Sequence, residues 1–524
     1  DFCLSRGLGD VYKRQIIYYK KMKRIKLFTA ALLLAAMSAG NDMWALSTSG
    51  KKDTHPVESP KFFSGNANPL SDFIFVADPT SMEYNGRLYV YGTNDTQQLD
   101  SVGKDGKNTY QYIHSLVMLS TDDMVNWTYH GLIDVKALSP WGIASWAPSI
   151  VSRIESDGKT HFYLYYSNSG AGVGVLTSTS PVGPWTDPLG RMLVSQFTQG
   201  LGHCKAPFDP GAVIDDEGIG WLSFGGGGKG EVGTDYMPGD ARIVRLGKDL
   251  ISLDSEIVEI KAPYHFEANE LNYWNGTWIY TYNTDWNKRT EWPHEGVDKP
   301  SICCMSYMTS HTPLDTDSWK YVDNYFKNPG DYGMGFSNNH THLQKYKGDY
   351  YLFYHNMCLQ EHKGTNGGFR SLCVNKLKVD EKNVKLEMGE ATLKGVDQIK
   401  PVNPFIHQQA ETTAATLGIH FEPTATPGNM LAVGSEQKKS VISVRGVFFS
   451  GFPSLFRATA AGHGTLEVHL DRPDGEVLAS TSFNSDSLQT VSTKINTDKD
   501  GIHNLYFVFK GKELKVDEWI FERF

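Results

Sequence analysis

The stretch WNGTWIYTYNTD, residues 274–285, joins an Asn-Gly pair to a strand-like run rich in aromatic residues. Asn-Gly beside apolar runs is the strongest short signal of a two-residue hairpin, because both turn positions need a positive φ. Four stretches repeat this pattern: YNGRLYVYGTND (84–95), SDGKTHFYLYYSNSG (156–170), DEGIGWLSFGGG (216–227) and YKGDYYLFYHN (346–356). Their turn glycines, with the one in the first stretch, are Gly86, Gly158, Gly218, Gly276 and Gly348.

These glycines recur every 58 to 72 residues, with strand patterns between them. Such a period predicts a β-propeller of five blades with four strands each. Ser/Thr-rich stretches that end in Trp127, Trp185 and Trp319 support the period, since each is typical of an outer turn covered by a packed indole. A sandwich or jelly roll is the alternative, but it seldom needs five near-equal units. We therefore expect an all-β chain with a five-bladed propeller over residues 66–400.

The chain of 524 residues is too long for one ordinary core, so two or three domains are expected. The propeller pattern ends at KPVNPF, residues 400–405, which has the composition of a linker. Residues 406–524 contain short alternating strands such as GTLEVHLD and HNLYFVFKG. This pattern predicts a β-sandwich module of the jelly-roll kind.

The N-terminal residues are expected to lie outside the folded domains. We interpret residues 1–21 as a non-native leader and residues 22–45 as a signal peptide, followed by a linker over 46–65. Three basic residues (Lys23, Arg24 and Lys26) precede an apolar run of about ten residues, which is too short to span a bilayer. The sequence therefore predicts a secreted or periplasmic protein without a membrane span.

The net charge of −9, with no strongly basic stretch, makes nucleic acid an unlikely partner. An aromatic content of 12% instead favours sheets and sugar-binding surfaces.

A distinctive residue lies seven to eleven positions before each hairpin turn. These residues are Asp78, Trp146, Asp209, Glu267 and His340. Because the innermost strand of every propeller blade runs beside the axis, equivalent positions converge at one end of the channel. The sequence therefore predicts one pocket that contains three carboxyl groups, a histidine and an indole wall.

Three acids in one cleft suit glycosidic bond cleavage. One carboxylic acid protonates the departing oxygen, and one carboxylate activates water. A third carboxylate raises the pKa of the acid by like-charge repulsion. A single Asp-Pro is more often only a turn, but the same position recurs in three blades.

At these residues the chain resembles family 43 of the glycoside hydrolases, over roughly residues 66–400. The motifs are ADP (77–79), WAP (146–148), DP (209–210) and EA (267–268) followed by NG (275–276). The resemblance implies that Asp78 is the general base, Asp209 the acid that orients and modulates, and Glu267 the general acid. Glu270 is the nearest rival for the acid, although its spacing to the turn differs by three. An inverting mechanism that requires no cofactor is also implied.

Three further residues match substrate-binding positions of that family: Trp146 as a wall of the sugar subsite, His340, and Arg370 as a contact to sugar hydroxyls. His340 also matches a histidine associated with a bound calcium or a water cluster. A packed histidine without metal remains the alternative.

The C-terminal stretch resembles carbohydrate-binding module family 6. Glu411 in QQAE matches an acidic residue that holds a structural calcium there. Leu488 stands where that family usually places a stacking Trp, so we expect the usual sugar face to be impaired and the module to brace the propeller or line its pocket.

We expect an α-L-arabinofuranosidase or β-xylosidase that acts on arabinoxylan, a plant cell-wall hemicellulose. An arabinanase with the same chemistry is one alternative. A non-catalytic glycan-binding propeller is another, which loss of any of the three acids would favour.

Overall fold

A computed structural model describes residues 61–62, 64–227, 233–435 and 439–523. Within these residues the elements are mostly β-strands, which confirms the predicted all-β class. The expected leader (1–21), the expected signal peptide (22–45) and residues 46–60 of the expected linker lie outside the described residues. Over the described ranges, no helix is both long enough and apolar enough to cross a bilayer.

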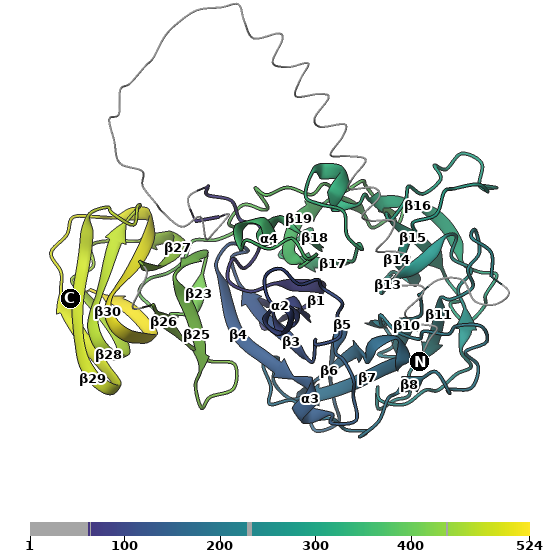
Figure 1. Ribbon diagram of the computed structural model, residues 1–524, viewed down its shortest axis with the longest axis horizontal. Helices are drawn as coiled ribbons and strands as arrows, with labels where there is room; N and C mark the ends of the chain where they lie inside the picture. Colours follow the sequence, from purple (N-terminus) through teal and green to yellow (C-terminus); the bar gives the residue numbers. More distant parts are fainter. Residues whose placement is uncertain (1–60, 63, 228–232, 436–438, 524) are drawn as a thin grey trace, which may run out of the picture. The chain divides into compact units, whose positions relative to one another are not determined.

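Five antiparallel sheets surround a common axis and form the predicted propeller (Figure 1). Blade 1 contains β1 (Val76–Tyr84), β2 (Arg87–Asn94), β3 (Ser115–Thr121) and β4 (Trp127–Asp134). Blade 2 contains β5 (Trp146–Ile154), β6 (Thr160–Ser167), β7 (Gly172–Ser178) and β8 (Val194–Ser195). Blade 3 contains β9 (Gly211–Ile214), β10 (Gly220–Phe224), β11 (Arg242–Arg245) and β12 (Val258–Glu259). Blade 4 contains β13 (His265–Trp274), β14 (Thr277–Thr284), β15 (Met305–Ser310) and β16 (Lys320–Phe326).

Blade 5 has three strands rather than the predicted four: β17 (Thr341–Tyr346), β18 (Asp349–Asn356) and β19 (Ser371–Leu377). The small hairpin of β20 (Val379–Asp380) and β21 (Lys385–Leu386) follows it. The short helices α2 (Asp95–Val102), α3 (Val135–Leu138) and α4 (Cys358–His362) lie in the loops between strands, as do the 3-10 turns Ser169–Ala171 and Pro329–Tyr332. The first strands of neighbouring blades contact one another around the whole ring, so β1, β5, β9, β13 and β17 line the axis.

The predicted hairpin turns have the expected backbone conformation. Gly86, Gly158, Gly218, Gly276 and Gly348 all have positive φ, between 75° and 92°. In three turns the residue before the glycine also has a positive φ, of 49° to 50°: Asn85, Asn275 and Lys347. Two successive positive φ values match the twist of the flanking strands, so these turns set the register of the inner hairpins.

Apolar side chains fill the spaces between neighbouring blades. Between blades 5 and 1, for example, Val76 and Leu88 pack with Phe353 and Val374. Comparable clusters lie between the other neighbouring blades. Trp127, Trp185 and Trp319 are all buried, as their position before the outer strands predicted. The blades are thus held face to face by burial of apolar area.

The ring closes where the chain before blade 1 meets β19. The Leu70 N–H donates to the Leu372 carbonyl (2.8 Å). The buried Asn68 side chain acts as a substitute for a strand residue. Its Oδ1 accepts from the Val374 N–H (2.9 Å), and its Nδ2 donates to the carbonyls of Val374 (2.9 Å) and Thr392 (2.8 Å). One side-chain amide therefore links the start of the propeller to its end.

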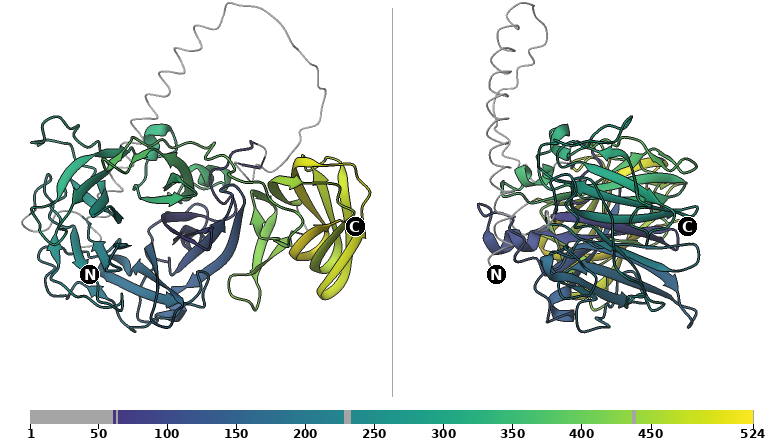
Figure 2. Two further views of the ribbon diagram at one scale, coloured as in Figure 1. Left: turned by 180° about the vertical axis from the view of Figure 1, so that it is seen from behind. Right: turned by 90° about the vertical axis from the view of Figure 1, so that its right-hand side faces the viewer.

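The C-terminal module forms one large sheet assembly around an aromatic core, which contains Phe449, Phe456, Phe507, Trp519 and Phe521. Its long strands β28 (Leu455–Leu470), β29 (Val477–Lys494) and β30 (Gly501–Glu522) lie side by side (Figure 2). Its remaining strands are β22 (Gln408–Gln409), β23 (Thr412–Thr413), β24 (Ala415–Leu417), β25 (Ile419–Pro423), β26 (Met430–Gly434) and β27 (Ser440–Phe449).

The module is joined to blade 1 by sheet pairing. Strand β23 pairs with β4 and extends that blade outward. The Thr416 N–H and hydroxyl both donate to the buried Asp72 carboxylate (2.9 Å each). Met430 packs into the apolar cluster between blades 5 and 1. Leu488 lies on the edge strand β29 and is 46% exposed. These contacts favour the expectation that the module braces the propeller.

We expect Asn68→Ala to lower the free energy of unfolding by about 2–5 kcal/mol, because it leaves the N–H and C=O of Val374 buried without partners. Unfolding in urea, followed by tryptophan fluorescence, measures the change. Asn66→Ala is the matched control: Asn66 is half-buried, and its replacement should change stability by less than about 0.5 kcal/mol. Equal effects from the two variants would contradict the closing role of Asn68.

Candidate active site

The innermost strands kink where the predicted site residues lie. Strands β1, β5 and β13 each carry a register shift there. Backbone φ is 49° at Asp78, 39° at Ala147, 51° at Asp209 and 61° at Ala268. Such values are uncommon outside glycine and cost about 1–3 kcal/mol each, so they persist only where the surroundings enforce them. A bulge re-aims the side chain beside it, here at one end of the axis.

Side chains from the preceding blade hold these kinks by accepting a hydrogen bond from the kinked N–H. The pairs are Asp78 N–H to His355 Nδ1 (3.1 Å), Ala147 N–H to Thr93 Oγ1 (2.8 Å), Asp209 N–H to Ser167 Oγ (2.8 Å) and Ala268 N–H to Asp209 Oδ2 (2.9 Å). The same contacts that pack the blades therefore fix the backbone of the site.

Asp78 is a buried carboxylate that its neighbours keep charged. Nη1 of Arg370 lies 2.8 Å from its Oδ1, and the Thr93 hydroxyl donates to Oδ2 at 2.7 Å. Burial alone would raise its pKa, but the Arg370 guanidinium, with His340 and His355, holds the pKa of Asp78 well below its usual range. Asp78 is therefore ionised and can accept a proton.

Glu267 and Asp209 have the opposite property. Burial, the Asp209 carboxylate and the Asp78 carboxylate raise the pKa of Glu267 to about 8. Burial raises the pKa of Asp209 to about 6, and the Asp78 charge adds to this while His340 opposes it. Glu267 is thus protonated near neutral pH. When two carboxyl groups in one site have pKa values shifted in opposite directions, one can serve as a base and the other as an acid.

His340 is buried beside the carboxylates, with Nδ1 3.5 Å from Asp78 Oδ1. Burial alone would lower its pKa, but the hydrogen bond and charge of Asp78 raise it. Among the described residues, no group of three or more His, Cys, Asp or Glu side chains is arranged to hold a metal ion. Calcium near His340 therefore stays a prediction.

Arg370 is placed by a residue that the sequence reasoning missed. Asp95 accepts from Nη2 of Arg370 (2.8 Å) and from its Nε (2.9 Å), so the guanidinium bridges Asp95 and Asp78. Both residues are buried. Asp95 directly follows Thr93 and Asn94 at the end of a quoted hairpin, and this polar ending to an aromatic strand was the signal that could have found it.

Trp146 lies near this bridge. Its indole N–H donates to the Tyr110 carbonyl (3.0 Å), and the Tyr110 ring lies 4.9 Å from the Arg370 guanidinium carbon. The insertion between β2 and β3, which carries Tyr110, therefore connects the predicted indole wall with Arg370.

Glu270, the rival for the acid, faces the next blade. Its Oε1 accepts from the Leu343 N–H (3.1 Å) and lies 2.8 Å from Nδ1 of His342. It belongs to a second set of hydrogen bonds between blades. In this set Thr80 Oγ1 accepts from the Ile150 N–H and Ser149 Oγ accepts from the Ala212 N–H. The side chain of Glu270 thus has a structural explanation.

The comparisons with known proteins agree with this arrangement. The model of glycosyl hydrolases family 43 matches residues 66–384, and the model of carbohydrate binding module (family 6) matches residues 409–523. The chain is 34% identical to the arabinoxylan arabinofuranohydrolase of Bacillus subtilis (strain 168), over 94% of this chain and 96% of that protein. It is 33% identical to the arabinoxylan arabinofuranohydrolase of Paenibacillus polymyxa, over 87% of this chain and 74% of that protein.

A solved structure extends the similarity to three dimensions. The family 43 arabinoxylan arabinofuranohydrolase from Bacillus subtilis, crystallised with cellotetraose, superimposes with a TM-score of 0.81. The two sequences are 32% identical, and the match covers 88% of this chain and 99% of that one. Since the family model covers more than half of the chain and a relative matches almost all of it, the chain belongs to family 43 of the glycosyl hydrolases.

Proposed function

We propose that this protein removes α-L-arabinofuranosyl side chains from arabinoxylan by hydrolysis with inversion. The observation that carries the proposal is the group of three carboxyl groups at one end of the axis, with Asp78 and Asp209 buried and Glu267 partly exposed. The neighbours of Asp78 lower its pKa, whereas burial and the Asp209 and Asp78 charges raise the pKa of Glu267 to about 8, so the first favours the charged form and the second the protonated form. A charged base and a neutral acid in one buried site are what glycosidic bond cleavage requires.

In this mechanism Glu267 donates its proton to the oxygen that links arabinose to the xylan chain. Asp78 accepts a proton from the water that attacks the anomeric carbon from the opposite face. Asp209 acts on Glu267 in two ways. Its charge raises the pKa of Glu267, and its Oδ2 accepts a hydrogen bond from the N–H of the adjacent Ala268. Arg370 keeps Asp78 ionised, because its Nη1 lies 2.8 Å from that carboxylate. The buried guanidinium is engaged by Asp78 and Asp95, so its predicted contact with sugar hydroxyls stays a prediction.

The substrate follows from the relatives that match nearly the whole chain, both of which are named arabinoxylan arabinofuranohydrolases. The family match and the paired C-terminal module support a polysaccharide substrate. Because such a polymer cannot enter a cell intact, we infer that the protein acts after export, in the periplasm or outside the cell. The expected signal peptide fits this location.

Calcium binding in the C-terminal module has a specific basis in the structure. Within the described ranges, Oε2 of Glu411 and Oε1 of Gln409 are buried and make no hydrogen bond. Burial raises the pKa of Glu411 to about 8, and the nearby Asp517 carboxylate adds to this. Oxygen atoms from carboxylates and amides are the ligands that Ca²⁺ prefers. Glu411, Gln409 and Asp517 would hold the ion, which would neutralise a carboxylate that burial otherwise penalises.

We expect Glu267→Gln to lower kcat on arabinoxylan by about 10²–10⁴-fold, the usual contribution of a general acid. The loss should be smaller on an aryl α-L-arabinofuranoside, because its leaving group needs less protonation. Glu270→Gln is the matched control, since the amide oxygen still accepts from the Leu343 N–H and kcat should stay near that of the wild type. Equal losses in both variants would contradict the assignment of the acid.

The same assays on other substrates separate the alternatives. Arabinose released from arabinoxylan is the expected product. Xylose released only from an aryl β-D-xyloside would make the protein a β-xylosidase, and oligomers from linear arabinan would make it an arabinanase. Folded wild-type protein that releases nothing from any substrate would favour a non-catalytic, glycan-binding role.

The pH dependence follows from the raised pKa of Glu267. Activity needs this group protonated, so kcat/KM should fall as pH rises through about 8. Because the Asp209 charge raises that pKa, Asp209→Asn should move the alkaline limb to lower pH. Profiles of kcat/KM against pH for both proteins measure the shift. An alkaline limb that stays in place would contradict the coupling.

If calcium occupies the module, its removal by a chelator should lower the melting temperature. Saturation at about 100 times the dissociation constant stabilises a fold by about 2.7 kcal/mol. Glu411→Gln should abolish the response to calcium. Glu422→Gln, which removes the carboxylate partner of Lys515 in the same module, should retain it. A melting temperature that does not respond to calcium in wild-type protein would refute this site.

A further inference from the structure

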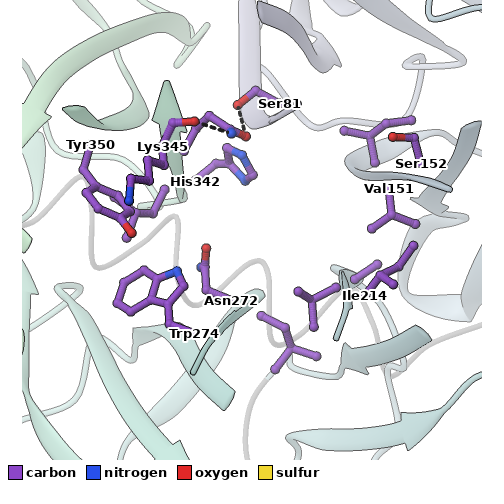
Figure 3. A pocket seen from close by; sticks show the side chains of 15 residues that line it. Ser81, Val151, Ser152, Ile214, Asn272, Trp274, His342, Lys345 and Tyr350 are labelled. Carbon is purple, nitrogen blue, oxygen red and sulfur yellow. Dashed lines mark hydrogen bonds between the residues drawn. The ribbon is translucent and has the colours of Figure 1, made fainter. Parts of the chain in front are cut away.

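The propeller axis carries a second cavity, which we call the rear cavity, of about 300 Å³. Residues from all five blades line it, and they include Ser81, Val151, Ile214, Asn272, Trp274 and His342 (Figure 3). Small-molecule sites start at about this volume and combine apolar walls with a few placed polar groups. None of these six residues belongs to the catalytic cluster described above.

The rear cavity lies at the other end of the inner strands from the carboxylates. Ile214 follows Asp209 by five residues, and Asn272 follows Glu267 by five. At about 3.3 Å per residue this places Ile214 and Asn272 roughly 15 Å along the axis from the carboxylates, whereas His342, two residues after His340, lies only about 7 Å along its strand from that histidine. Glu270, which lies between Glu267 and Asn272 on β13, contacts Leu343 and His342 in the lining of the rear cavity. A molecule in the rear cavity therefore would not occupy the catalytic site.

The walls of the rear cavity differ in character. Trp274 and Tyr350 form an aromatic pair on one side, with ring centroids 5.4 Å apart. Val151 and Ile214 supply aliphatic surface on the opposite side (Figure 3). Sugar rings present apolar C–H faces and polar edges, so an aromatic face beside hydrogen-bonding groups suits them.

Two polar atoms in this lining lack protein partners. Nδ2 of Asn272 and Nε2 of His342 are buried, and neither makes a hydrogen bond within the described part of the chain. Nδ1 of His342 lies 2.8 Å from the Glu270 carboxylate, so in the neutral imidazole the proton lies on Nδ1 and Nε2 is an acceptor. Asn272 supplies the complementary donor. A hydroxyl group, which both donates and accepts, satisfies such a pair.

The lining also disfavours a charged ligand. Its one permanently charged side chain is Lys345, whose amine pairs with Glu381 and lies 5.4 Å from the centre of the Tyr350 ring. No carboxylate is among the lining residues of this pocket. The cavity therefore offers no net charge to an ionic group, but it offers hydrogen bonds and apolar contacts to a neutral one.

We propose that the rear cavity is a non-catalytic site for a neutral saccharide of one or two units, in which Trp274 contacts the sugar face and Asn272 and His342 bind hydroxyls. The proposal does not depend on which sugar the catalytic end releases. It gives the propeller two sugar sites on one axis, one that cleaves and one that only binds.

The test uses full-length protein labelled with 5-fluorotryptophan and observed by ¹⁹F NMR during titration with xylobiose and, separately, L-arabinose. Trp274→Phe assigns the Trp274 resonance, and Trp146→Phe assigns a reporter for the catalytic end. We expect the Trp274 resonance to shift in a saturable manner with a dissociation constant on the order of 1 mM. The shift should persist in Glu267→Gln, in which hydrolysis is blocked.

Asn272→Ala should weaken this binding roughly tenfold, the effect of one lost hydrogen bond, while its kcat on arabinoxylan stays unchanged. Trp278→Phe assigns a control resonance. The Trp278 indole packs against Trp221 and does not line the cavity, so its resonance should not respond to the sugar. A Trp274 resonance that stays fixed, or that drifts linearly together with the Trp278 resonance, would overturn the proposal. Failure of catalysis with a retained Trp274 shift would count against the proposed function alone.

Discussion

The ion pair between Arg370 and Asp78 is the interaction on which the rest of the site depends. Burial opposes charge on every carboxyl group at this end of the axis, and without a cation all three would favour the neutral form. Arg370 contacts Asp78 directly and offsets that penalty there, whereas the pKa of Glu267 stays raised. The Asp78 charge then acts on its neighbours, and with Asp209 it keeps the proton on Glu267. In the proposed mechanism, one guanidinium thus makes one carboxyl group the base and leaves another as the acid. Asp95 holds that guanidinium through two hydrogen bonds.

The propeller supplies the contacts that hold this arrangement in place. Each blade brings one inner strand to the axis, and in blades 1 to 4 a kink near the start of that strand aims a side chain at the centre. The acceptor that holds each kink comes from the preceding blade, so the packing between blades and the geometry of the site are the same contacts. Further along the axis, the side chains of Thr80, Ser149 and Glu270 each accept a hydrogen bond from a backbone N–H of the following blade. Displacing one blade would therefore be expected to disturb both stability and catalysis.

Much of this could be predicted from sequence because it repeats. The Asn-Gly and Asp-Gly turns, the aromatic strands and the acidic residue before each hairpin all have local signatures. Convergence of Asp78, Asp209 and Glu267 followed from the symmetry of blades. The unpredicted parts have no repeat: Asn68 closes the ring through a contact 306 residues away. Asp95 meets Arg370 across 275 residues. The buried Oε1 atom of Gln409, which has no hydrogen bond to any described residue, depends on how the module folds. Single long-range contacts leave no periodic pattern.

The stereochemistry of the released sugar tests the central claim most directly, that Asp78 activates water while Glu267 protonates the leaving oxygen. Proton NMR of an α-L-arabinofuranosyl-substituted xylo-oligosaccharide, recorded at the start of hydrolysis before the product equilibrates, identifies the first anomer formed. The account predicts β-L-arabinofuranose, because water attacks the face opposite the leaving group. Initial formation of the α-anomer would contradict it, since that result requires a carboxylate to attack the sugar itself and form a covalent intermediate.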